Sequence, residues 1–124
     1  MSGPLILLVD DFDDALDVYA TYLTHKGYQV DVATNGEEAV AMAEQRPPAL
    51  ILMDLSMPIL DGTAALKRLR SDPRFTSTPI LALTAHALDE QRRFALAAGF
   101  DAVIAKPCLP DDLVTAIVGF LGDV

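Results

Sequence analysis

The sequence predicts a doubly wound α/β fold, in which helices cover both faces of a five-stranded parallel sheet. Two observations predict it: five short apolar runs recur along the 124 residues, and segments with helical spacing of apolar residues separate them. This alternation gives five βα units with right-handed crossovers. Because the chain is short and contains no linker, repeat or low-complexity segment, we expect a single domain, residues 1–124.

The five apolar runs have the length and composition of strands. Four are nearly continuous in apolar character, which is typical of parallel strands covered on both faces. The second, with the sequence QVDVA, alternates apolar and polar residues and therefore suits an edge position. The predicted strands are Leu5–Val9, Gln29–Ala33, Leu50–Met53, Ile80–Leu83 and Ala102–Ala105.

The first two intervening segments carry clear helix signals. The first ends at Gly27, which suits a left-handed C-terminal cap. In the second, Asn35 can cap the helix, glutamates occupy the first turn, and prolines end it. His25 would place a favourable charge near a helix C-terminus. One face of the first helix is predicted to carry Phe12, Leu16, Tyr19 and Leu23.

The last three helices follow the same pattern. In DGTAALKRLRSDP, Gly62 eases entry into the helix. The segment LDEQRRFALAAG has Asp89 as a cap and Gly99 as a stop. In LPDDLVTAIVGFL, four apolar residues share one face: Leu113, Ala116, Ile117 and Phe120.

Composition narrows the function classes. A net charge of -9, from 18 acidic and 9 basic residues, repels phosphate backbones, so this chain is not expected to bind nucleic acid. Despite 52% hydrophobic residues, no apolar run is long enough to cross a membrane. The single cysteine, Cys108, excludes an internal disulfide, and no signal peptide is evident, so we expect a cytoplasmic protein.

Polar residues follow the predicted strands at their carboxyl ends. In open α/β sheets this is where ligands bind, near the point at which strand order reverses. Five polar side chains should therefore converge on one rim of the sheet, although they lie far apart in sequence: Asp10, Asp11, Asp54, Thr84 and Lys106.

Three carboxylates at one rim require compensation. Two carboxylates about 4 Å apart repel by roughly 4 kcal/mol at an effective dielectric of 20, so a divalent cation is expected among them. Oxygen ligands without histidine or thiolate favour Mg²⁺. Asp54 could then act as a nucleophile toward a phosphoryl group, with Mg²⁺, Lys106 and Thr84 receiving the transferred oxygens.

Simpler roles exist for each residue taken alone. Asp10 and Asp11 could be helix N-caps, Thr84 could bond to backbone, and Lys106 could be a surface cation. Only their shared location favours the chemical interpretation. A phosphoryl-carrying role for His86 has little support, because nothing holds it beside a phosphate donor.

Four segments together resemble the receiver domain of two-component response regulators: LLVDDF, LILMDLSMPILDG, ILALTAHA and GFDAVIAKP. The resemblance covers essentially the whole chain and implies sheet order 2-1-3-4-5. It implies that Asp54 accepts a phosphoryl group from a phosphohistidine, making the chain a phosphoprotein. It further implies Mg²⁺ bound directly by Asp11, Asp54 and the Ser56 carbonyl, with Asp10 acting through water.

The resemblance also assigns roles around the phosphoryl group. Lys106 would pair with it, and Thr84 would swing its hydroxyl onto it. The Lys106–Pro107 bond is a candidate cis peptide. Ser56 and His86 would tune phosphoryl lifetime. One position departs from the family: Val103 stands where a Tyr or Phe usually changes rotamer on activation, and its short β-branched side chain cannot report that change in the same way.

The expected function is a phosphorylation-controlled switch. Its partners would be a histidine kinase or histidine phosphotransfer domain, and a downstream protein. A turnover enzyme is disfavoured, because haloacid-dehalogenase-like phosphatases carry a general-acid aspartate where this chain has Ser56. Nucleotide binding is disfavoured because there is no Gly-rich loop. The remaining alternative is a protein-binding module that ignores phosphorylation, which Val103 keeps open.

Overall fold

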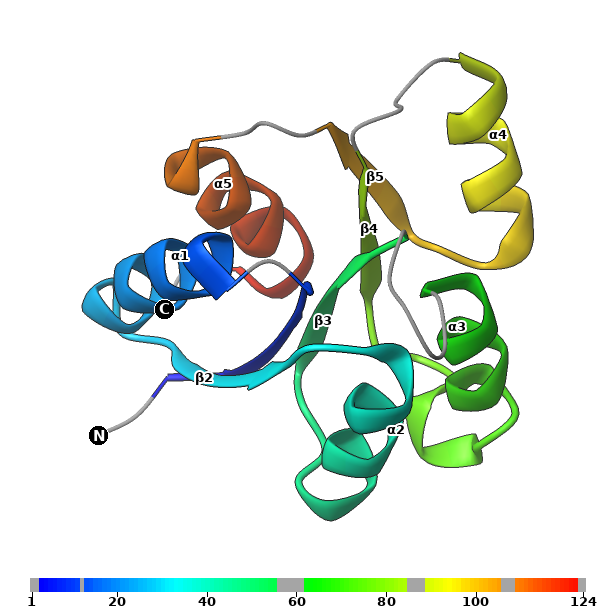
Figure 1. The fold of residues 1–124 in the computed structure, drawn as a ribbon, viewed down its shortest axis with the longest axis horizontal. Coiled ribbons are helices and arrows are strands. Elements are labelled where there is room, and N and C mark those ends of the chain that lie inside the picture. Colours follow the sequence, from blue (N-terminus) through cyan, green and yellow to red (C-terminus); the bar gives the residue numbers. More distant parts are fainter. Residues whose placement is uncertain (1–2, 12, 56–61, 85–88, 106–108, 123–124) are drawn as a thin grey trace.

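The computed structural model contains a parallel sheet of five strands in the order β2-β1-β3-β4-β5, with helices packed on both sides (Figure 1). The structure describes residues 3–11, 13–55, 62–84, 89–105 and 109–122. Of residues 13–15 it describes the backbone but not the side chains. The predicted fold class and strand order are both confirmed. Within the described residues the elements are β1 (Leu5–Val9), α1 (Asp13–His25), β2 (Gln29–Ala33), α2 (Gly36–Gln45), β3 (Leu50–Asp54), α3 (Gly62–Arg70), the 3₁₀-helix η1 (Pro73–Phe75), β4 (Ile80–Thr84), α4 (Asp89–Ala98), β5 (Ala102–Ala105) and α5 (Pro110–Leu121).

Two strands are one residue longer than predicted. β3 includes Asp54 and β4 includes Thr84. Backbone pairing between β3 and β4 extends to Asp54. Beyond it, the Leu55 amide still donates a hydrogen bond to the Leu83 carbonyl oxygen of β4 at 3.0 Å. A polar side chain does not interrupt a ladder made by backbone groups. Both polar residues therefore belong to the rigid sheet.

The two faces of the sheet are covered by different helices (Figure 1). α2, α3 and α4 pack on one face and α1 and α5 on the other. Because side chains alternate along a strand, successive residues enter opposite cores. The first core includes Leu7, Val9, Ala39, Ile51, Met53, Leu66, Phe75, Ile80 and Phe100. The second includes Ile6, Leu8, Leu16, Leu23, Leu50, Leu52, Leu81, Leu83, Leu113 and Ile117.

The observed helix ends agree with those predicted from the sequence, except at the start of α4. Asn35 caps α2 by accepting a hydrogen bond from the Glu38 amide at 2.8 Å. Gly27 and Gly99 have φ of 103° and 122°, as a left-handed cap requires. α4 begins at Asp89 itself, so Asp89 lies in the first turn and is not the cap. There its charge still favours the helix dipole. Phe12, predicted on the buried face of the first helix, lies outside the described residues.

The prediction for Phe120 was wrong. This ring is 44% exposed, while Leu113 and Ile117 are fully buried. The buried stripe of α5 advances by four residues at each step, and Leu121 continues it by packing partly against the same core. Phe120 lies beside this stripe. None of the helices in the described part of the chain is long and apolar enough to span a bilayer.

Arg70 joins three segments at the amino end of the strands. Its guanidinium donates hydrogen bonds to the carbonyl oxygens of Phe75 at 2.7 Å, Thr78 at 2.8 Å and Gly99 at 3.2 Å. It also pairs with Asp101 at 2.8 Å. The same Asp101 carboxylate oxygen accepts a hydrogen bond from the Ile80 amide at the start of β4. We call this group, with Arg70 at its centre, the amino rim.

Candidate metal centre

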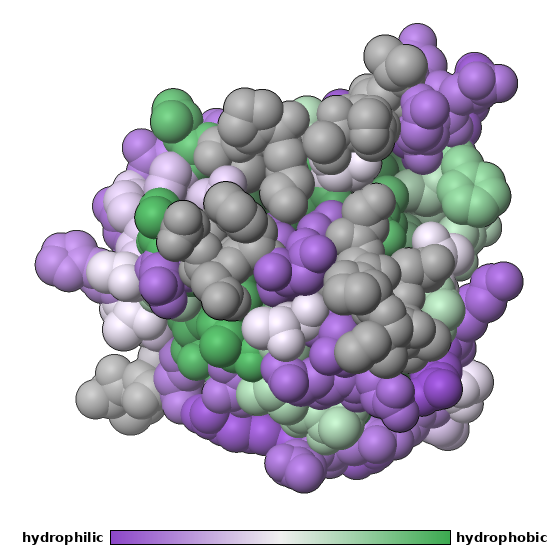
Figure 2. Space-filling view, in the orientation of Figure 1, coloured by the Kyte–Doolittle hydropathy of each residue, from purple (hydrophilic) through white to green (hydrophobic). Residues whose placement is uncertain are grey.

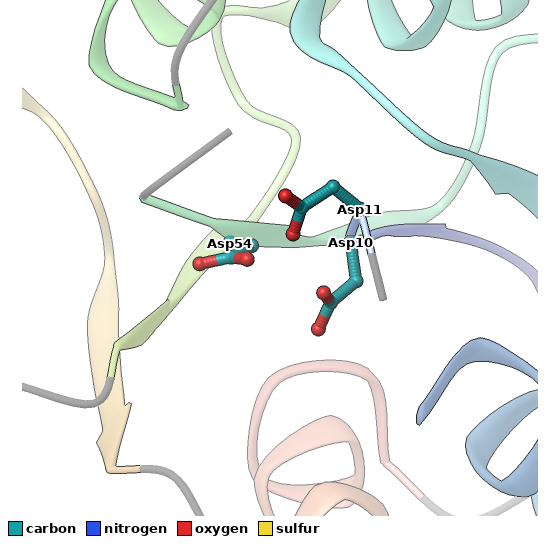
Figure 3. Close-up of side chains that lie close together, drawn as sticks. All are labelled: Asp10, Asp11 and Asp54. Atoms are coloured by element: carbon teal, nitrogen blue, oxygen red, sulfur yellow. The ribbon is translucent and has the colours of Figure 1, made fainter. Parts of the chain in front are cut away.

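Three aspartate side chains gather at the carboxyl end of the sheet (Figure 3). Each of Asp10, Asp11 and Asp54 offers a carboxylate oxygen, and these oxygens lie within 4.8 Å of one another. Asp10 is fully buried and Asp54 is 5% exposed, whereas Asp11 faces solvent. In Figure 3 the Asp11 carboxylate points toward Asp54. The structure thus brings together the three carboxylates that the sequence placed at this rim.

The adjacent strands β1 and β3 hold the cluster. Their register pairs Val9 with Met53, so the residues that follow come side by side. The Asp10 amide donates a hydrogen bond to the Ala33 carbonyl oxygen of β2 at 3.1 Å, which extends the ladder beyond the last residue of β1. This hydrogen bond to β2 fixes the backbone of Asp10. The hydrogen bond from the Leu55 amide to β4 fixes the backbone that follows Asp54.

The cluster concentrates negative charge. At the upper limit of 4.8 Å, two carboxylates repel by about 3 to 4 kcal/mol at an effective dielectric of 20. This dielectric suits the buried pair Asp10 and Asp54. Repulsion that involves exposed Asp11 is closer to 1 kcal/mol, because water screens it. A cation or a proton at this site would relieve the repulsion.

The donor set fits Mg²⁺. Carboxylate oxygens are the ligands that this ion prefers. Two oxygens bound directly to one Mg²⁺ at about 2.1 Å can be at most ~4.2 Å apart, so a spacing of up to 4.8 Å suits two direct ligands and a third that acts through water. The individual roles stay predictions, with Asp11 and Asp54 expected to bind directly and Asp10 through water.

Thr84 lies on β4, which neighbours β3, and Val103 lies on β5, at the far side of β4. Thr84 is the last residue of β4 and is 7% exposed. Asp54 pairs with Leu83, so Thr84 lies one position further toward the same rim. Val103, on β5, is partly buried against the core beneath α2, α3 and α4. We call Asp10, Asp11, Asp54 and Thr84 the carboxyl rim.

Other predicted site residues lie outside the described residues: Ser56, His86, Lys106 and Pro107. Their predicted roles, including the cis peptide at Pro107, stay predictions. Sequence reasoning missed the close approach of Gly62 to the strand end that carries Asp54. Glycine after Asp61 suggested only a turn, and no local signal in the sequence indicates which backbone the glycine contacts.

The surface around the cluster differs from the surface over α1. The face of the molecule in Figure 2 shows hydrophilic atoms at its centre, where β1 and β3 end in Figure 1. Hydrophobic surface appears beside α1, toward β2. An open groove lies on that side and is lined by residues that include Val18, Tyr22, Val30 and Pro110.

Comparison with known proteins identifies the family. The family model of the response regulator receiver domain matches residues 6–118. The chain belongs to the response regulator receiver family. Its members are phosphoryl-accepting signalling modules of two-component systems and not small-molecule metabolic enzymes. The resemblance inferred from the sequence motifs is confirmed.

Individual relatives agree with this assignment. Response regulator Rre1 of a Synechocystis strain is 36% identical over 123 residues, which cover 98% of this chain and 53% of Rre1. Chemotaxis protein CheY4 of Vibrio cholerae has a similar structure, with a TM-score of 0.92 and 29% identity over 97% of this chain and all of that chain. The chain therefore spans about half of Rre1 but the whole of CheY4.

A third similar protein is described with a metal. It is the receiver domain of sensor histidine kinase PA1611 from Pseudomonas aeruginosa, whose structure has a magnesium ion coordinated in the active site cleft. The TM-score is 0.90, and the sequences are 35% identical over 98% of this receiver chain and all of that one. The receiver domain of this histidine kinase and the chemotaxis protein CheY4 are thus about equally similar to this chain in fold.

Proposed function

We propose that this receiver domain accepts a phosphoryl group on Asp54 and thereby switches its affinity for a protein partner. The observation that carries the proposal is the position of Asp54, which is rigidly held at the end of β3 within 4.8 Å of two other carboxylates. In the transfer, the P–N bond of a phosphohistidine breaks as an Asp54 oxygen bonds to phosphorus. The imidazole nitrogen keeps the electron pair of the broken bond.

Each residue of the site has a proposed task. Asp11, Asp54 and the Ser56 carbonyl hold Mg²⁺ directly, and Asp10 holds it through water. When bound, Mg²⁺ offsets the negative charge of the carboxylates and of the incoming phosphoryl oxygens. Lys106 pairs with the transferred group, and the Thr84 hydroxyl donates to it. Ser56 and His86 control the access of water to the phosphorylated product.

The carboxyl rim supports this division of work. Asp54 and Thr84 end neighbouring strands, so an acceptor oxygen and a hydroxyl donor emerge from the same rigid sheet. A rigid sheet holds reacting groups at fixed separation, which lowers the entropic part of the barrier. The magnesium described for the similar PA1611 receiver is consistent with the same use of the acidic residues here.

The test is intact-mass measurement after exposure to acetyl phosphate, with and without Mg²⁺. Wild type should gain the mass of one phosphoryl group only when Mg²⁺ is present, and Asp54→Asn should gain none. Asp31→Asn is the matched control, because Asp31 lies on β2 and pairs with the exposed Arg46 at 2.9 Å. Phosphorylation of Asp54→Asn, or none in wild type, would refute the proposal.

The proposed phosphoryl donor is a histidine kinase or histidine phosphotransfer domain in the cytoplasm. The open groove beside α1, lined by the apolar residues Val18 and Val30, is the proposed docking surface. A downstream protein would read the phosphorylated state. We further propose that residues 1–124 act as one receiver unit without binding nucleic acid or membrane.

Val103 favours one alternative, a module that binds its partner irrespective of phosphorylation. The usual aromatic switch residue is replaced by a partly buried valine with few rotamers. Partner affinity separates the two functions. Equal affinity of the partner for Asp54→Ala and for phosphorylated wild type would support the alternative, and a difference would support the switch.

A further inference from the structure

Gly62, the first residue of α3, lies directly against the backbone of Asp54 and Leu55. A Cβ atom built on Gly62 would be 2.4 Å from the Asp54 carbonyl oxygen, 3.0 Å from Leu55 Cα and 3.2 Å from the Asp54 carbonyl carbon. The Gly62 amide also donates a hydrogen bond to the Leu55 carbonyl oxygen at 3.3 Å. The start of α3 therefore contacts the strand end that presents the acceptor carboxylate.

Space, and not backbone conformation, requires glycine at this position. The glycines of the described segments that have positive φ are Gly27, Gly99 and Gly122, and Gly62 is not among them. An alanine could therefore adopt the backbone conformation of Gly62. Its obstacle is the contact of Cβ with three backbone atoms, which no side-chain rotation can relieve.

The contacted peptide has little room to move away. The Leu55 amide is bonded to the Leu83 carbonyl oxygen at 3.0 Å, and Asp54 pairs with Leu83 across β3 and β4. To bring the Cβ–oxygen distance from 2.4 Å to the shortest contact that real Cβ atoms show, the two backbones must separate by more than about half an ångström. A shift of that size at Asp54 alters its distance to the carboxylates of Asp10 and Asp11, which directly follow β1.

We infer that Gly62 is a positioning residue: its lack of a side chain sets the separation between α3 and the end of β3 and so holds Asp54 beside Asp10 and Asp11. The inference rests on the proposed function. Because misplacement by 1 Å can cost a reaction on the order of a hundredfold, a shift of about half that size should slow phosphorylation by roughly tenfold.

The experiment compares three glycine substitutions. Gly62→Ala tests the contact. Gly99→Ala is the stability control, since a φ of 122° strains any side chain there at a distance from the acidic cluster. Gly119→Ala is the neutral control, because a Cβ at this position of α5 has nothing within 4 Å. Each variant is measured for melting temperature, for Mg²⁺ affinity by calorimetry, and for its rate of phosphorylation by acetyl phosphate.

The expected result separates position from stability. Gly62→Ala should bind Mg²⁺ more weakly and accept phosphoryl groups about tenfold more slowly. Gly99→Ala should melt at lower temperature with wild-type affinity and rate, and Gly119→Ala should match wild type in both. Wild-type affinity and rate in Gly62→Ala would overturn the inference, because α3 would then have moved in place of Asp54. An equal loss in Gly99→Ala would also overturn it.

A measurement on wild type covers the case in which Gly62→Ala does not fold. In ¹⁵N-resolved NMR, the Gly62 amide should shift on titration with Mg²⁺ along the binding curve, while the Gly119 amide stays in place. A stationary Gly62 resonance would overturn the inference. If wild type itself neither binds Mg²⁺ nor accepts a phosphoryl group, the proposed function fails first, and this inference fails with it.

Discussion

The two ends of the sheet use charge in opposite ways. At the carboxyl rim, Asp10, Asp11 and Asp54 place like charges within 4.8 Å of one another. At the amino rim, the guanidinium of Arg70 meets the Asp101 carboxylate and four backbone carbonyl oxygens, including that of Thr76 at 3.4 Å. Like charges repel one another at the carboxyl rim, and opposite charges attract one another at the amino rim.

The difference teaches where function and stability are located in this fold. Like charges that are held together favour the binding of a compensating cation, and complementary charges stabilise the junction of chain segments. Changes at the carboxyl rim should therefore alter binding and chemistry with little loss of stability. Changes at the amino rim should do the reverse.

The largest effect is expected for Asp11→Asn. Asp11 is proposed to bind the ion directly, so its removal should weaken Mg²⁺ binding at least about a hundredfold, or roughly 2.7 kcal/mol. Calorimetric titration measures the affinity. In wild type, Mg²⁺ at a hundred times its Kd should raise the free energy of unfolding by about 2.7 kcal/mol, and the variant should lose this increase.

The control for Asp11→Asn lies at the other rim. Asp101→Asn should lower stability, because the variant loses the ion pair with Arg70, but it should bind Mg²⁺ as wild type does. Without metal, Asp11→Asn should be as stable as wild type or slightly more stable, since one of three like charges is gone. A marked destabilisation of metal-free Asp11→Asn would contradict the division between the rims.

A smaller effect, on stability alone, is expected for Arg70→Ala. Five hydrogen-bond acceptors, in the segments that precede β4 and β5, lose this donor, and water replaces the partly exposed guanidinium at only some of them. The cost should therefore be about 2 to 4 kcal/mol. Urea unfolding measures it. Arg46→Ala, which removes a half-exposed pair with Asp31, should cost less than about 1 kcal/mol. Weaker Mg²⁺ binding by Arg70→Ala would show that the rims are coupled.

The smallest effect is a pH dependence at the loop after α3. The side-chain hydrogen bonds from Arg74, together with its backbone amide, lower the pKa of Asp72. The ionised form therefore stabilises the fold above the ordinary aspartate pKa of about 3.9, and this contribution is lost as pH falls through the lowered pKa.

Asp72→Asn keeps the hydrogen-bond acceptor that caps η1 but removes the charge. The difference in unfolding free energy between wild type and this variant should be constant near neutral pH and should shrink below about pH 4. Urea unfolding at a series of pH values measures it. A difference that grows toward acid pH would contradict the assigned direction.

Much of the fold could be predicted because its signals are local. Continuous apolar runs marked the covered strands, alternation marked β2 as an edge strand, and Gly27 and Gly99 marked the ends of helices. The carboxylate cluster followed from a topological rule, since parallel strands end at the same rim. Phe120 was misplaced because helical spacing alone does not separate residues at the border of a buried stripe from those within it.

The remaining features depend on contacts between distant segments. Arg70 contacts Gly99 and Asp101, which follow it only after another strand and helix. The contact of Gly62 with Asp54 depends on how closely a helix approaches a strand, and this distance is not encoded in a residue pattern. Such packing distances are set by the whole core.

The order β2-β1-β3 places the two halves of the acidic cluster on strands separated in sequence by α1, β2 and α2. A cut in the exposed connection at Pro47 would leave Asp10 and Asp11 on one fragment and Asp54 on the other. Neither peptide alone would retain the full set of ligands. Reassembly of the fragments could be followed by the return of metal affinity, so the strand order makes this chain suitable as a split reporter of association.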